Sequence, residues 1–189
     1  MAMMHLSRVP GRPQPGRRFA WALVLGLAFV VTGGPGPGPA RGTVSAQALN
    51  ACALLKVDEI EQLTPNTTVN DGVAASLPAF GSVTCQYVWG VGTGRFKLDV
   101  VVNDATRIFP GMSPEQMKQR LVESVKTGTD DAVVAEVGEA AVFKPGSPVY
   151  ATATALVKGH VLQLNLDGVF AGEMKDQVVG LLKSAASRL

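Results

Sequence analysis

The positions of two cysteines constrain the fold of this chain more than any other feature. Cys52 begins the stretch Cys-Ala-Leu-Leu, and Cys85 begins the stretch Cys-Gln-Tyr-Val-Trp. An even number of cysteines in an exported chain is typical of a disulfide, because disulfides persist in oxidising compartments. Closing a loop of about 34 residues stabilises a fold by about 3–4 kcal/mol in the chain-entropy model. We therefore expect a disulfide between Cys52 and Cys85 that fixes an N-terminal helix to a β-hairpin.

The spacing of these cysteines argues against two other roles. A redox-active pair favours a Cys-x-x-Cys spacing at a helix start, which is absent from the sequence. Two cysteines without histidine partners do not make a zinc site. We therefore expect no metal site and no cofactor.

Residues 1–48 have the composition of a signal peptide followed by a Pro/Gly-rich leader. They contain five arginines and no acidic residue, and residues 19–31 form an uncharged apolar run of thirteen residues. A helix needs about 20 residues to cross a bilayer, whereas the shorter run suits a signal-peptide core. Ala46-Gln47-Ala48 is a small-x-small cleavage site. The sequence therefore predicts cleavage after Ala48 and a single exported domain over residues 49–189, in the periplasm or outside the cell.

Two membrane-bound alternatives stay open. The apolar run is also compatible with an uncleaved anchor, and Leu49-Asn50-Ala51-Cys52 has some likeness to a lipidation motif. However, Asn50 is unusual at its position in such a motif, and the apolar run ends twenty residues before Cys52. Lipidation of Cys52 would also leave Cys85 as a lone thiol. We expect membrane association only if the leader is retained or Cys52 is lipidated.

The charge of the mature region argues against nucleic acid as a partner. Residues 49–189 contain twelve basic and fifteen acidic residues, and these charges are scattered along the sequence. Nucleic-acid binding needs a concentrated basic surface that neutralises phosphates. Apolar residues make up 47% of the chain, which favours a packed core.

Hydrophobic periodicity predicts the order helix, hairpin, helix, short strand, hairpin, helix. The helices are expected over residues 54–63, 113–128 and 172–188, the hairpins over 84–103 and 149–167, the short strand within 133–143, and an exposed loop over 64–82. Ser113 and Gln116 have the pattern of a capping box at the start of the second helix, with Pro114 at its first position. The face of the second hairpin that carries Thr152, Thr154, Gln163 and Asn165 is expected to meet water. The turn at Lys158-Gly159 sets the register of the second hairpin and pairs Ala151, Ala153 and Ala155 with Leu166, Leu164 and Leu162. The sequence thus predicts an α+β fold, with an antiparallel sheet built from two hairpins and helices packed on one face.

Few residues of the mature region suit catalysis. His160 is its one histidine and stands beside a hairpin turn, where we expect it to be solvated, and no Gly-x-Ser-x-Gly elbow is present. Asp130 and Asp131 are adjacent but lack a visible third metal ligand. The glycines of residues 90–94 lead into a strand and therefore form a hairpin turn, because a phosphate loop leads into a helix. We therefore expect no catalytic residue and no metal ligand.

Tyr87, Trp89 and Arg95 are the candidate binding residues. If the two aromatic side chains face the core, they pack against the disulfide. If Trp89 lies exposed at the strand end, it forms an anchor for a partner, with Arg95 as its neighbour.

Three short motifs resemble a known group of proteins. Cys-x-Leu-Leu precedes an acidic helix, Cys-x-Tyr-x-Trp opens a hairpin, and Val-Gly-Glu-Ala-Ala at residues 137–141 precedes the last hairpin. Together they resemble small exported bacterial envelope proteins and lipoproteins of unknown function. The resemblance covers most of residues 50–189. It implies a sandwich of sheet and helices similar to the Mog1/PsbP-like fold, and it brings no catalytic residues.

The expected function is that of an exported, non-enzymatic envelope domain that binds a protein or a small ligand. A small secreted hydrolase that uses scattered carboxylates or His160 is one alternative. A structural accessory subunit of an envelope complex is the other.

Overall fold

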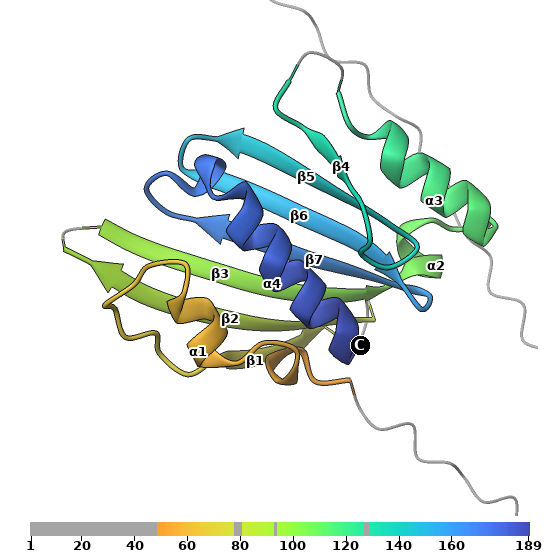
Figure 1. Cartoon of the computed structure of the whole chain (residues 1–189). Helices are drawn as coiled ribbons and strands as arrows, with labels where there is room; N and C mark the ends of the chain where they lie inside the picture. Colours follow the sequence, from red (N-terminus) through yellow and green to blue (C-terminus); the bar gives the residue numbers. More distant parts are fainter. Residues whose placement is uncertain (1–48, 78–80, 93, 127–128) are drawn as a thin grey trace, which may run out of the picture. The chain divides into compact units, whose positions relative to one another are not determined.

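The computed structural model describes residues 49–77, 81–92, 94–126 and 129–189 (Figure 1). The expected leader over residues 1–48, its cleavage site and the expected helix end at Gly128 lie outside the described residues.

The described residues form a seven-stranded antiparallel sheet in the order β1-β2-β3-β7-β6-β5-β4. The strands are β1 (Val73–Leu77), β2 (Ser82–Val91), β3 (Gly94–Asp104), β4 (Ala132–Val134), β5 (Ala140–Ser147), β6 (Tyr150–Val157) and β7 (His160–Asp167). Two meanders, β1-β2-β3 and β4-β5-β6-β7, meet in the middle of the sheet, where β3 pairs with β7. The α+β class and the antiparallel sheet are therefore confirmed.

Helices cover both faces of this sheet (Figure 1). They are η1 (Ala51–Ala53), α1 (Val57–Glu61), α2 (Ala105–Ile108), α3 (Pro114–Glu123), η3 (Ala171–Glu173) and α4 (Lys175–Arg188). The main core lies between one face of the sheet and η1, α1 and α4. A smaller core lies on the other face, under α2 and α3.

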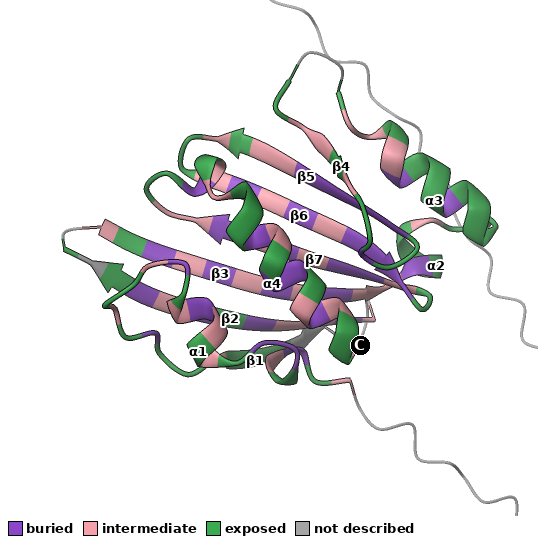
Figure 2. Cartoon of the chain, viewed as in Figure 1, coloured by how far each residue is buried: buried purple, intermediate pink, exposed green. Residues whose placement is uncertain are grey.

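The alternation of the central strands creates the main core. Leu98, Val100 and Val102 of β3 point to the same face as Leu162, Leu164 and Leu166 of β7, and all six are fully buried. Buried and less buried positions alternate along β3 (Figure 2). The predicted register of the second hairpin is confirmed, since Ala151, Ala153 and Ala155 pair with Leu166, Leu164 and Leu162. Small residues on β6 leave room for α4, whose buried side chains recur at Val178, Leu181, Leu182 and Ala185.

Two expectations about the architecture are wrong. Helices do not pack on one face only, because Met117 and Leu121 of α3 pack on the opposite face from α4. Their partners include Val142 of β5, and Leu156 and Val161, which lie on the face of the second hairpin that was expected to meet water. The sheet also has more strands than two hairpins supply, because β1 forms within a segment expected to be a loop and β4 and β5 extend the other edge.

The capping signals at the start of α3 are confirmed. Ser113 accepts a hydrogen bond from the backbone N–H of Gln116, and the Gln116 side chain accepts one from the Ser113 N–H. Pro114 occupies the first helical position, where its missing N–H has no consequence.

Candidate functional site

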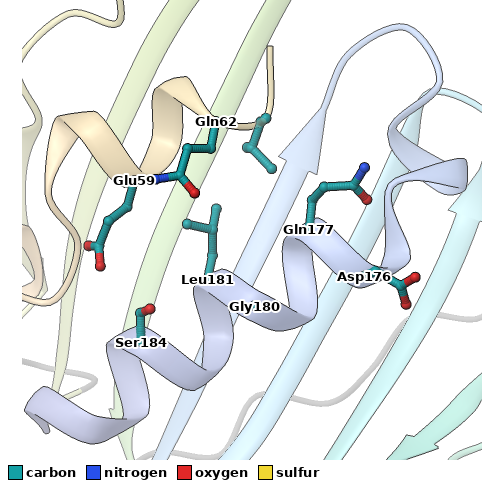
Figure 3. A pocket seen from close by; sticks show the side chains of 8 residues that line it. Glu59, Gln62, Asp176, Gln177, Gly180, Leu181 and Ser184 are labelled. Atoms are coloured by element: carbon teal, nitrogen blue, oxygen red, sulfur yellow. The ribbon is translucent and has the colours of Figure 1, made fainter. Parts of the chain in front are cut away.

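A groove of about 440 Å³ lies between α1 and α4 on the face of the sheet that carries the main core (Figure 3). Buried Leu63 and Leu181 form its apolar part, and Gln62 reaches from α1 toward α4. Glu59 and Ser184 lie at one end, and Asp176 and Gln177 lie at the other. The full set of lining residues is Glu59, Gln62, Leu63, Asp176, Gln177, Gly180, Leu181 and Ser184.

Helix α4 presents two different faces to its surroundings. One face carries the buried apolar stripe, and the adjacent face carries Asp176, Gly180 and Ser184, which are spaced one turn apart. A Cβ added at Gly180 would meet no atom within 4 Å, so the packing of the chain does not require a glycine there. Because Gly180 has no side chain, the groove is wider at the middle of α4.

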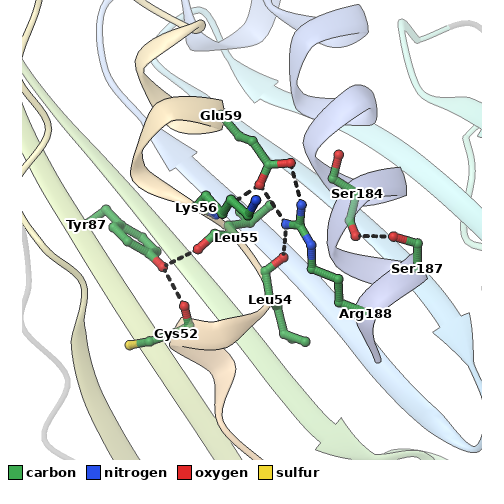
Figure 4. Close-up of polar contacts among 9 residues, drawn as sticks. All are labelled: Cys52, Leu54, Leu55, Lys56, Glu59, Tyr87, Ser184, Ser187 and Arg188. Atoms are coloured by element: carbon green, nitrogen blue, oxygen red, sulfur yellow. Dashed lines mark hydrogen bonds and ion pairs between the residues drawn. The ribbon is translucent and has the colours of Figure 1, made fainter.

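The disulfide and Tyr87 position the segment that precedes α1. Cys52 is bonded to Cys85 of β2, with their Cα atoms 5.0 Å apart, so the predicted disulfide is present. The Tyr87 hydroxyl donates to the carbonyl oxygens of Cys52 and Leu55, each at 3.2 Å (Figure 4). Burial raises the pKa of Tyr87, with a smaller effect from the Glu59 charge, so the hydroxyl remains a donor at neutral pH.

An ion pair joins the two helices at the end of the groove (Figure 4). The guanidinium of Arg188 donates two hydrogen bonds to the Glu59 carboxylate, at 2.6 and 2.7 Å, and a third to the Leu54 carbonyl at 2.8 Å. Glu59 also accepts from the Lys56 N–H at 2.9 Å. The hydrogen bond from Arg188 is the largest cause that lowers the pKa of Glu59 to about 2, against the opposing effect of burial. Glu59 is therefore an anionic structural group, not a proton donor at neutral pH.

The other polar side chains of the groove are available to a ligand. Among the described hydrogen bonds, none involves the side chain of Gln62, Asp176 or Gln177. Two amides offer both donors and acceptors, and Asp176 adds an acceptor. The arrangement is suited to binding a molecule that combines polar groups with an apolar surface.

The candidate binding residues predicted from the sequence lie outside this groove. Tyr87 and Trp89 are only 2% and 3% exposed, because β2 directs both toward the main core. The Trp89 ring stacks on Phe96 with centroids 5.4 Å apart, and its Nε1–H donates to Thr64 Oγ1 at 2.6 Å. Both side chains therefore face the core, and the exposed anchor at Trp89 is wrong. Arg95 is exposed but points to the opposite face of the sheet from Phe96 and Trp89.

The other residues considered for catalysis or metal binding lie apart from one another. His160 is half-buried and pairs in register with Asp104, whose carboxylate accepts from the Thr106 N–H and hydroxyl as a helix cap. Asp131 accepts from the Lys126 N–H, also as a local turn contact. Within the described residues, no three His, Cys, Asp or Glu side chains form a group able to hold a metal ion.

No helix in the described part of the chain is both long enough and apolar enough to span a membrane.

The groove was not predicted from the sequence, although one residue of the sequence indicates it. Gly180 interrupts the middle of a predicted helix, where glycine costs about 1 kcal/mol relative to alanine. The facing residue Gln62 carried no such signal, because its position depends on how α1 docks.

Comparison with known proteins gives no match: no family model, no curated protein and no solved structure matches the chain.

Proposed function

We propose that this chain is an exported, non-enzymatic domain of the bacterial envelope that binds a small ligand in the groove between α1 and α4. Its leader over residues 1–48 is removed after Ala48, and the domain acts in the periplasm or outside the cell. The disulfide is consistent with this location, because disulfides persist in oxidising compartments. We further propose that it belongs with the small exported envelope proteins that its motifs resemble, and that its fold is Mog1/PsbP-like.

The groove carries the proposal. Its volume of about 440 Å³ lies within the 300–1,000 Å³ range typical of small-molecule sites. Apolar contact comes from Leu63 and Leu181, and orientation comes from the amides of Gln62 and Gln177. The ligand chemistry that fits is an uncharged or cationic molecule with hydrogen-bonding groups, because Asp176 disfavours anions, whereas Arg188 compensates the charge of Glu59.

The Val-Gly-Glu-Ala-Ala motif supports the family proposal through its structural role. Gly138 has a φ of +58°, and a Cβ there would overlap the Leu156 carbonyl oxygen. Glu139 accepts from the Lys158 N–H at 2.9 Å and so stabilises the turn between β6 and β7. A motif with these roles fits a family that shares a fold without shared catalytic residues.

Gly180 allows a matched test of the groove. A panel of water-soluble neutral and cationic fragments is screened against the isotope-labelled protein by NMR, and backbone signals report where each fragment binds. In Gly180→Phe the new ring occupies the groove, and its Cβ has room because no atom lies within 4 Å of that position. Gly180→Ala adds only a methyl group and leaves most of the groove volume open.

Fragments that bind in the groove shift the signals of Gln62, Gly180 and Ser184. Their binding is lost in Gly180→Phe and kept in Gly180→Ala. If no fragment shifts these signals, or if Gly180→Phe binds the same fragments as the wild type, the groove is not the ligand site.

A further inference from the structure

A second pocket lies beside the C-terminal half of α4, on the face of the sheet that carries the main core. Its volume of about 340 Å³ is within the range typical of small-molecule sites. The pocket is separate from the groove between α1 and α4, because the two share no lining residue. The lining residues are Glu136, Val137, Gly138, Glu139, Val157, Lys158, Lys183, Ala186 and Ser187.

The apolar part of this pocket comes from the edge of the main core. Val137 and Val157 are 3% and 4% exposed, and Ala186 of α4 packs against the same core. A hydrocarbon group placed here would contact aliphatic side chains of its own kind. The pocket therefore has room and chemistry for a small saturated side chain.

Two turns form walls of the pocket that are joined to each other. The Glu139 N–H donates to the Leu156 carbonyl at 2.8 Å, and the Glu139 carboxylate accepts from the Lys158 N–H at 2.9 Å. Gly138 has a φ of +58° and lies so close to the Leu156 carbonyl oxygen that a Cβ would overlap it. The turn before β5 is thus fixed against the turn between β6 and β7, and these two walls are preformed.

Charges of both signs surround the pocket, two acidic and two basic: Glu136, Glu139, Lys158 and Lys183. Lys183 Nζ of α4 lies 3.5 Å from Glu136 Oε2, and the two side chains are 62% and 82% exposed. An ion pair this exposed contributes little to stability, so a ligand can take its place at little cost. Glu136 also has a φ of +63°, an uncommon backbone conformation for a residue other than glycine, and such conformations concentrate at ligand sites.

We propose that this pocket binds a free aliphatic α-amino acid, whose carboxylate pairs with Lys183 and whose ammonium pairs with Glu136. The bonds at the Cα atom of an amino acid hold the ammonium nitrogen and the carboxyl carbon about 2.5 Å apart. Both ligand charges therefore fit a pair of protein charges that are 3.5 Å apart. The ligand exchanges one exposed ion pair for two, and its side chain covers Val137 and Val157.

The balance of charge at the pocket favours a zwitterion over a simple amine or acid. An amine would pair with Glu136 and leave Lys183 without a counter-charge, and a carboxylic acid would do the reverse. A zwitterion compensates both side chains and leaves the net charge of the pocket unchanged.

The test compares three probes by NMR on the isotope-labelled full chain at pH 7 and constant ionic strength. They are L-leucine, 3-methylbutan-1-amine, which is leucine without its carboxylate, and 4-methylpentanoate, which is leucine without its ammonium. Lys183→Met removes one partner charge, and Lys175→Met is the matched control, because Lys175 is an exposed residue of α4 that does not line the pocket. Thermal unfolding confirms that each variant is folded.

We expect leucine to shift the backbone signals of Val137, Gly138 and Ala186 in a saturable way. Binding should weaken at least about tenfold for each single-charge probe and for Lys183→Met, and it should be unchanged in Lys175→Met. The proposal is overturned if leucine does not saturate these signals, if either single-charge probe binds as tightly, or if Lys183→Met has no effect.

The signals also separate this pocket from the groove between α1 and α4. Leucine that shifts Gln62, Gly180 and Ser184 instead belongs to the groove, and the proposal for the second pocket is then wrong. Gly180→Phe should bind leucine like the wild type, because Gly180 does not line the second pocket. Failure of the groove proposal therefore leaves this result unaffected.

Discussion

At the scale of single residues, the ion pair between Glu59 and Arg188 predicts a pH-dependent stability. The pKa of Glu59 falls from 4.5 to about 2 on folding, chiefly because Arg188 donates to its carboxylate. A carboxyl with a lowered folded-state pKa stabilises the fold above its unfolded pKa, and this contribution disappears as the pH falls from 4.5 toward 2. We expect Glu59→Gln to lower the free energy of unfolding by about 2 kcal/mol at pH 7, after allowance for solvent screening.

Urea denaturation of wild type and variant at pH 7, 4 and 2.5 measures this effect. The difference should shrink steadily toward the lowest pH. Asp58→Asn is the matched control, because Asp58 is an exposed neighbour that makes none of the described hydrogen bonds, and it should change stability by less than about 0.5 kcal/mol. A difference for Glu59→Gln that stays constant from pH 7 to 2.5 would show that the ion pair is not its source.

Two glycines should respond in opposite directions to the same substitution. Gly138→Ala forces a left-handed backbone on alanine and drives its Cβ into the Leu156 carbonyl oxygen, so we expect a loss of at least about 2 kcal/mol. Gly180→Ala adds a methyl group in open space within a helix, so we expect a gain of about 0.5–1 kcal/mol. Thermal and urea unfolding measure both. A destabilised Gly180→Ala would mean that the chain itself needs this glycine.

At the scale of elements, the disulfide should contribute much of the stability of the η1–α1 segment. It joins residues 33 positions apart and fixes η1 to β2, where Tyr87 adds two carbonyl contacts. We expect the double variant Cys52→Ala, Cys85→Ala to lose about 2–4 kcal/mol in urea unfolding. Reductant should lower wild-type stability by a similar amount and leave the variant unchanged. Equal stability of the wild type with and without reductant would contradict the prediction.

The elements that the sequence predicted well are those fixed by local patterns. The two-residue turn at Lys158-Gly159 set the register of β6 and β7, and the capping box at Ser113 placed the start of α3. The strand β1 was not predicted because it follows Asn70-Asp71-Gly72, a pattern typical of a loop. Its formation depends on pairing with β2, which the local sequence of β1 does not indicate. The helices on the second face of the sheet, α2 and α3, were not predicted to pack there. Residues 140–143 are all buried because side chains on both faces of this strand are covered, and such a continuous apolar run has no alternation that would indicate a covered second face.

The candidate groove was beyond sequence prediction for a similar reason. Its walls come from α1 and α4, which are more than a hundred residues apart in the chain. Only the docking of both helices on one sheet face brings Gln62 and Gln177 together. Trp89, by contrast, was predicted as a candidate binding residue because it is aromatic, and the alternation of side chains along β2 places it in the core.

At the scale of the whole molecule, the disulfide makes lipidation and a closed Cys52–Cys85 link mutually exclusive. A lipid on the Cys52 sulfur occupies the atom that bonds Cys85, so a lipidated chain would carry one free thiol and no disulfide. We expect the protein recovered from its native host to begin at Leu49, to carry no lipid and to contain no free thiol. Intact mass measurement with and without reduction and alkylation determines all three properties in one sample. A lipid adduct accompanied by one alkylated cysteine would instead establish a membrane-anchored protein, and α1 would then be held over β2 by the Tyr87 contacts without the covalent link.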